Sequence, residues 1–135
     1  MSAVDAAKIW SLNYRVLLSV IACAEADICA LGLESKELFL LAEVDEHPYP
    51  AELAATLSMP KATVTVYLKR LEAAGFVSRE IDPADLRRHR ILLTELGRKA
   101  AKGGLVLLSN EFNKRLERLT AAQQKNLKNL LEKIL

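Results

Sequence analysis

After Gly75 the spacing of the apolar residues changes from that of a helix to that of a strand. The segment FVSREI alternates apolar with polar residues, Asp82-Pro83-Ala84-Asp85 is a turn sequence, and HRILLT follows as a second strand. We therefore predict a β-hairpin in a chain that is otherwise helical. The composition agrees, because 51% of the residues are hydrophobic while only 5% are aromatic and five are glycine, which favours helices over a β-sandwich.

The first predicted helix, residues 4–30, carries more apolar surface than one small domain can bury. Asp5 lies in its opening turn and Gly32 follows its end. After Val16 the helix is apolar nearly all round, so it has to be buried on more than one side, and 135 residues offer little material for this. We therefore expect a homodimer whose interface comprises residues 4–30 and 105–135, because the C-terminal segment also has an apolar face.

Caps and helix breakers predict five further helices. Ser35 is expected to cap a second helix that runs to about Asp45, and Pro50 suits the first turn of a third. The fourth helix is KATVTVYLKRLEAAG, and the threonines at positions 94 and 120 are expected to cap the fifth and sixth. With the hairpin, the predicted order is ααααββαα, a mostly α fold in a single domain of residues 1–135.

The third and fourth helices, separated by Met59-Pro60, form a predicted helix-turn-helix. Four residues at helical spacing should pack inward, namely Val64, Tyr67, Leu68 and Leu71. The opposite face has small groups that allow close approach to base edges and cations that suit phosphates. This predicted reading face consists of Lys61, Ala62, Thr63, Thr65, Val66, Lys69 and Arg70.

Positive charge begins abruptly at Lys61. Residues 1–60 hold three basic and nine acidic residues, whereas residues 61–90 hold seven basic and four acidic ones. We expect a hairpin tipped by four basic residues, Arg87, Arg88, His89 and Arg90. A solvated charge run is the ordinary alternative. A basic hairpin directly after a helix-turn-helix instead predicts a winged helix whose arginines reach a narrow minor groove.

The stretch from Leu33 to Gly97 resembles the winged-helix core of the MarR family of transcriptional regulators. The resemblance rests on AELAATLSMPKATVTVYLKRLEAAGFVSRE, then Asp85-x-Arg87, then Leu93-Thr94-x-x-Gly97. It implies a dimer, built from the first and last helices, on a pseudo-palindromic operator. Many family members release DNA on binding a small aromatic or phenolic ligand, and some on cysteine oxidation.

The resemblance also implies roles for single residues. Asp85 would hold Arg87 through an ion pair, and Arg87 would enter the minor groove. Asp85 as a simple turn residue is an equal alternative. Val66 stands where the family often has arginine, so a common base contact is missing and its side chain could meet a thymine methyl instead.

We therefore expect a sequence-specific DNA-binding regulator, a homodimeric repressor, with a winged-helix core at residues 33–97. The alternative is a winged-helix module for protein interaction. No Gly-rich phosphate loop occurs and the chain has only two histidines, so we expect no enzyme, no metal site and no cofactor. Trp10 and Tyr14, at helical spacing, could share an effector pocket with Phe39; the alternative is that all three are core or interface aromatics.

Cys23 and Cys29 lie six residues apart in the first predicted helix, so they point in different directions and cannot bridge each other. We expect buried, reduced thiols. Redox sensing is the alternative, although neither cysteine has a basic neighbour in the sequence. No stretch of about 18 uncharged apolar residues and no signal-peptide pattern occurs, so we expect a cytoplasmic protein that contacts no membrane.

Overall fold

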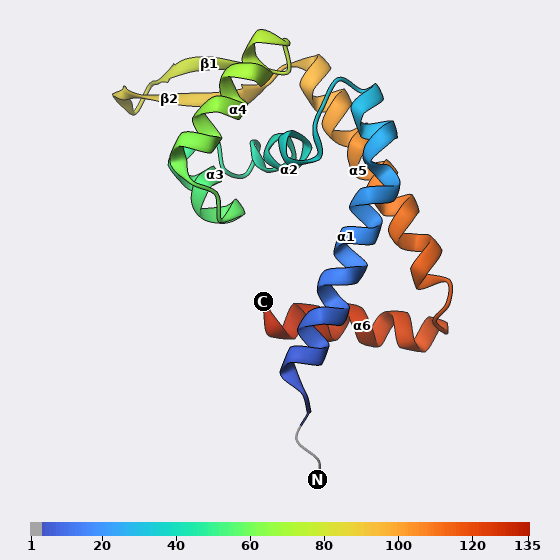
Figure 1. Cartoon of the computed structure of the whole chain (residues 1–135). Coiled ribbons are helices and arrows are strands. Elements are labelled where there is room, and N and C mark those ends of the chain that lie inside the picture. Colours follow the sequence, from blue (N-terminus) through green and yellow to red (C-terminus); the bar gives the residue numbers. More distant parts are fainter. Residues whose placement is uncertain (1–3) are drawn as a thin grey trace. The chain divides into compact units, whose positions relative to one another are not determined.

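The computed structural model describes residues 4–135, and within them the chain forms six helices and one antiparallel hairpin (Figure 1). The order ααααββαα and the mostly α winged-helix fold are confirmed. The elements are α1 (Ala6–Ala30), α2 (Ser35–Glu43), α3 (Pro50–Leu57), α4 (Lys61–Ala73), β1 (Val77–Asp82), β2 (Asp85–Leu93), α5 (Glu95–Leu116) and α6 (Ala121–Ile134).

These elements divide into two compact units. The central unit is Glu25–Val106, and the terminal unit combines the N-terminal part of the chain up to Ala24 with Leu107–Leu135. The long helices α1 and α5 each contribute to both units. No single helix among residues 4–135 is long and apolar enough to cross a membrane; α1 and α2 reach that standard only when taken together as a bent pair.

The central unit contains the hydrophobic core, because its short helices each turn one apolar stripe inward. The side chains of Ile28, Leu33, Leu38, Leu40, Leu41, Val44, Leu53, Val64, Leu68, Leu71 and Ile91 are almost fully buried. Gly32 and Gly75 follow the ends of α1 and α4 with φ of 85° and 82°, a left-handed conformation that glycine adopts without strain. Pro50 begins α3, as predicted.

The start of α2 differs from the prediction. Ser35 is the first helical residue and Glu34 is the N-cap, with its backbone N–H donating to Glu37 Oε1 at 2.9 Å. The Ser35 hydroxyl is buried and has no hydrogen-bond partner among residues 4–135. The Glu37 carboxylate satisfies the free backbone N–H of Glu34, so the helix begins one residue earlier than a serine cap at position 35 would allow.

The second strand is longer than predicted, because β2 begins at Asp85 rather than at His89. The register pairs Val77 with Leu93 and Ile81 with His89, then shifts so that Asp82 pairs with Asp85 across a two-residue turn. An Asp82 side-chain oxygen accepts from the Ala84 amide at 2.9 Å and closes that turn. The basic residues therefore lie along β2 rather than at the hairpin tip.

Thr94 and Gly97 attach the hairpin to α5. The Thr94 hydroxyl accepts from the Gly97 amide at 3.0 Å, which confirms it as the cap, and donates to the Gly75 carbonyl at 2.5 Å. The Thr94 amide donates to the Phe76 carbonyl oxygen at 3.1 Å. Because Gly97 has no side chain, α5 can lie directly against the Phe76 backbone.

The terminal unit has almost no core of its own. Among its described residues only Val20 and Ala24 are buried apolar side chains, and α6 has no buried residue. Thr120 caps α6 as predicted, accepting from the Gln123 amide at 3.2 Å. Large apolar side chains that remain exposed include Ile9, Trp10, Leu12, Tyr14, Val16, Leu17, Leu18, Leu130, Leu131 and Ile134.

Candidate nucleic-acid interface

Helix α4 presents a small, mixed polar face to solvent. Val64, Leu68 and Leu71 are buried as predicted, and Tyr67 is half-buried. On the other face Lys61, Ala62, Thr65, Val66, Lys69 and Arg70 are exposed, while Thr63 is half-buried. Such a face allows a helix to lie closely in a major groove.

Two polar residues on this face have partners within the chain. The Arg70 guanidinium lies 3.0 Å from Glu34 Oε1 and 3.6 Å from Glu37 Oε1, and the hydrogen bond to Glu34 is the main cause of its raised pKa. In this structure Arg70 ties α4 to the start of α2, and its contact with a phosphate stays a prediction. The Thr65 hydroxyl donates to the Lys61 carbonyl at 3.0 Å, so its lone pairs remain free to accept.

Asp85 binds Arg87 differently from the expected ion pair. Its carboxylate accepts a hydrogen bond from the Arg87 backbone amide at 3.0 Å, and no ion pair joins the two side chains among the residues described. The alternative interpretation of Asp85 as a turn residue therefore describes the geometry. The Arg87 side chain is exposed.

The other two arginines of β2 are held by side chains elsewhere. The Arg88 guanidinium carbon lies 3.6 Å from the centre of the Tyr49 ring, a cation–π contact. Arg90 pairs with Glu80 on the neighbouring strand. Sequence reasoning missed Tyr49, because it belongs to the loop before α3 and lies far from the hairpin in the sequence.

Tyr49 also bonds to the buried Asp82. Its hydroxyl donates to Asp82 Oδ2 at 2.5 Å. This hydrogen bond raises the pKa of Tyr49 and lowers the pKa of Asp82, and the Ala84 amide lowers the Asp82 pKa further. Asp82 is therefore held as a carboxylate that accepts two hydrogen bonds.

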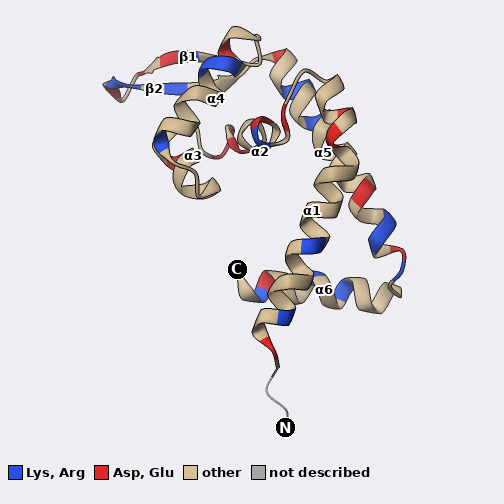
Figure 2. Cartoon of the chain, in the orientation of Figure 1, with Lys and Arg blue, Asp and Glu red and all other residues tan. Residues whose placement is uncertain are grey.

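Three cations of residues 61–90 have neither an ion-pair nor a stacking partner in the described part of the chain: Lys61, Lys69 and Arg87. Figure 2 shows the basic residues of this region along α4 and β2. Arg79, on β1, pairs with Glu72 of α4 at 2.9 Å and joins the hairpin to that helix. Helix α4 packs against β1, the strand that pairs with β2, so the exposed cations lie on the helix and on the hairpin beside it.

The suggested effector residues are split between the two units. Trp10 and Tyr14 stack with ring centres 5.7 Å apart and belong to the terminal unit, where both are exposed. Phe39 is half-buried in the central unit. A pocket shared by all three stays a prediction.

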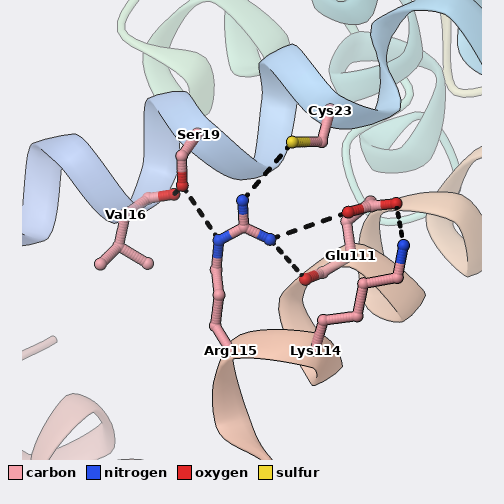
Figure 3. Close-up of polar contacts among 6 residues, drawn as sticks. All are labelled: Val16, Ser19, Cys23, Glu111, Lys114 and Arg115. Atoms are coloured by element: carbon pink, nitrogen blue, oxygen red, sulfur yellow. Dashed lines mark hydrogen bonds and ion pairs between the residues drawn. The ribbon is translucent and has the colours of Figure 1, made fainter. Parts of the chain in front are cut away.

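Both cysteines are exposed, so the expectation of buried thiols is wrong. Figure 3 shows the surroundings of Cys23 in the terminal unit. Its sulfur lies 3.6 Å from a terminal nitrogen of Arg115, which also donates to Ser19 Oγ at 3.0 Å and to the Glu111 carbonyl at 2.7 Å. This basic neighbour comes from another helix, so adjacency in the sequence could not reveal it.

Glu43, Glu46 and His47 bring possible metal-ligand atoms within 4.8 Å of one another. The two ring nitrogens of His47 lie 4.0 Å from Glu43 and 3.8 Å from Glu52. When its ring is protonated, His47 forms ion pairs with Glu43 and Glu52.

Comparison with known proteins identifies relatives of this chain. A sequence model described as MarR family matches residues 31–88. The HTH-type transcriptional repressor Rv2887 of Mycobacterium tuberculosis is 32% identical over 136 residues, covering 99% of this chain and 98% of that protein.

Solved structures of MarR family proteins have the same fold as this chain. The crystal structure of Rv2887 in complex with DNA has a TM-score of 0.77 at 30% identity and covers 98% of each chain. The Rv2887 complex with salicylic acid has a TM-score of 0.75 at 32% identity, over 92% of this chain and 93% of that one. Wild-type apo MarR from E. coli shares the fold, with a TM-score of 0.80 at 23% identity over 99% of both chains.

Proposed function

This chain belongs to the MarR family, and we propose from that premise that it is a homodimeric transcriptional repressor that binds a pseudo-palindromic DNA operator. The observation that carries the proposal is the set of unpaired cations on α4 and β2, beside a helix face of small residues. A relative of 30% identity over nearly the whole chain was crystallised with DNA, which supports the same activity here.

In this proposal α4 lies in the major groove. Thr63 accepts or donates hydrogen bonds at base edges, and Thr65 accepts them, because its hydroxyl proton is bound to the Lys61 carbonyl. Val66, which is 56% exposed, contacts a thymine methyl together with Ala62. Lys61 and Lys69 bind phosphates. The hairpin acts as the wing, with Arg87 in the adjacent minor groove, where negative potential is strongest when the groove is narrow.

The terminal unit supplies the dimer interface in this proposal. Exposed apolar side chains of α1 and α6 need a cover that the unit does not contain. An apolar groove of about 540 Å³ runs between α5 and α6 and is lined by Phe112, Leu116, Leu127 and Leu131 among others. We assign its occupant as a helix of a second copy, so that residues 4–30 and 105–135 dimerise and residues 33–97 bind DNA.

A small aromatic acid is the proposed effector. Rv2887 was crystallised with salicylic acid and with p-aminosalicylic acid, and it is 32% identical to this chain. Trp10 and Tyr14, whose rings stack in the terminal unit, are the residues we propose to contact the effector. We propose a cytoplasmic regulator without enzymatic activity, in keeping with the regulators it resembles.

Selection from random DNA duplexes, followed by fluorescence anisotropy, tests the function. We expect one enriched palindromic sequence whose affinity exceeds that of random duplexes by about 1000-fold or more. Salicylate should lower that affinity, and sedimentation at micromolar concentration should show a species of twice the 15.0 kDa chain mass. Equal affinity for all duplexes would reject the repressor in favour of a winged-helix module that binds protein.

A further inference from the structure

Tyr49 and its neighbour Pro48 contact both strands of the hairpin. The Tyr49 hydroxyl binds Asp82 at the end of β1, and the Tyr49 ring lies under Arg88 of β2. The Pro48 carbonyl accepts from the Ile91 amide of β2 at 2.7 Å. A single loop before α3 thus fixes the hairpin at three points.

These contacts act where the strand pairing alone is weakest. The register shifts between Ile81, which pairs with His89, and Asp82, which pairs with Asp85, so residues 86–88 of β2 have no regular partner on β1. Arg87 lies in this irregular stretch. Its backbone is held by Asp85 on one side, and the next residue, Arg88, is held by the Tyr49 ring on the other.

The three arginines of β2 differ in their partners within the chain. Arg88 is engaged by Tyr49, and Arg90 pairs with Glu80 and is half-buried. Arg87 is exposed and has no ion-pair partner among residues 4–135. Arg87 and Arg88 are both exposed, and Arg87 is the one whose guanidinium has neither an ion-pair nor a stacking partner among residues 4–135.

We propose that Tyr49 is a positioning residue for DNA binding, which holds Asp82 and Arg88 so that Arg87 is the guanidinium presented to the minor groove. This inference rests on the function proposed above and adds the residue that determines the wing's geometry. Tyr49 acts through the hairpin and does not itself touch DNA. Its ring and hydroxyl have separate tasks, because the ring holds Arg88 and the hydroxyl holds Asp82.

The test measures affinity and salt dependence on the selected duplex. Tyr49→Phe keeps the ring and removes the hydroxyl, and we expect it to weaken binding by about tenfold across two wings. Tyr49→Leu removes both contacts and should weaken binding further. Urea unfolding of each variant gives its folded fraction, to which the affinities are referred.

Substitutions that remove one positive charge distinguish the roles of Arg87 and Arg88 in DNA binding. Arg87→Gln should lower the slope of log K against log salt by about 1.8 for two wings. Arg88→Gln should change the slope no more than Lys36→Gln, which removes an exposed cation from α2. In the Tyr49→Leu background, Arg87→Gln should cost less affinity than in the wild type, because Arg87 is no longer held in place.

The outcomes distinguish this inference from the function on which it rests. If the wild type prefers no duplex, the proposed function and the positioning role both fall. A selective wild type with Tyr49 variants of equal affinity overturns the positioning role alone, and so does Arg88→Gln with the same slope change as Arg87→Gln. Loss of the ring-current shift of the Arg88 side-chain N–H in Tyr49→Leu, seen by NMR without DNA, would support the stacking.

Discussion

Replacing Gly97 with alanine should destabilise the protein by bringing a methyl group against the hairpin backbone. A Cβ at this position would overlap the Phe76 carbonyl oxygen and lie 2.8 Å from the Phe76 carbonyl carbon. Backbone cannot swing aside as a long side chain can, so α5 and the hairpin would have to separate by roughly 1.5 Å to restore ordinary contact. That separation stretches the Thr94 amide to Phe76 carbonyl hydrogen bond, now 3.1 Å long.

The size of the effect follows from three opposing contributions. Overpacking costs about 1–3 kcal/mol, and the weakened hydrogen bond costs about 1 kcal/mol. Alanine favours the helical conformation over glycine by about 1 kcal/mol. The net expectation for Gly97→Ala is a loss of about 2 kcal/mol in the free energy of unfolding.

Gly103→Ala is the matched control, because it makes the same substitution in the same helix. The nearest atom to a Cβ at Gly103 is Leu31 Cδ1 at 3.9 Å, an ordinary contact. We expect this variant to gain up to about 1 kcal/mol. Urea unfolding at one fixed protein concentration measures both, since the stability of a dimer depends on concentration. Equal midpoints for the two variants would refute the close approach at Gly97.

Three further changes test other parts of the structure. Gly104→Ala should be destabilising by about 1–3 kcal/mol in urea unfolding, because the new methyl would overlap the fully buried Leu38 side chain. Thr120→Ala should cost about 1 kcal/mol through loss of the α6 cap, unless α6 is already unfolded in solution, in which case the midpoint stays the same. The hydrogen bond from Tyr49 lowers the pKa of Asp82 below the ordinary value of 3.8. The charged carboxylate therefore stabilises the fold fully above that pH, and this stabilisation is lost as the pH falls through the lowered pKa. Asp82→Asn should remove this pH dependence from the acid-unfolding profile.

Local rules of the backbone explain how much of the fold was predictable. Gly32 and Gly75 end helices because their φ values are positive, and Pro50 starts a helix because its ring fixes φ near a helical value. The Thr94 and Thr120 caps also depend on residues only three positions away. All these features involve a few consecutive residues, and the structure confirms them.

Features that depend on distant residues were not predictable in the same way. The start of β2 at Asp85 depends on a register shift and on Asp82, which is itself bound by Tyr49, 33 residues earlier. The Arg70 to Glu34 pair joins residues 36 positions apart. Helical period correctly places Arg70 on the outer face of α4, but it carries no information on which carboxylate lies opposite.

The exposed cysteines show a second limit of sequence reasoning. Cysteine is usually buried in a folded chain, and that tendency led to the wrong expectation for Cys23 and Cys29. The same helix leaves Trp10 and Leu17 exposed, because the terminal unit has almost no core. An apolar pattern predicts that a surface will be covered, but it does not say whether the cover comes from the same chain or from a second copy.

A count of basic residues in the sequence therefore overstates the number of cations available to bind DNA phosphates. Residues 61–90 contain seven basic side chains, and if all of them bound phosphates a dimer would release counterions with a salt slope of about −13. In the structure Arg70, Arg79 and Arg90 form ion pairs and Arg88 stacks on Tyr49. With Lys61, Lys69 and Arg87 as the remaining contacts, six per dimer, the slope should be about −5. Anisotropy titrations between about 50 and 200 mM salt measure it directly. A slope near the larger value would mean that the internal pairs open on DNA, and that the wing arginines are not sorted by the fold.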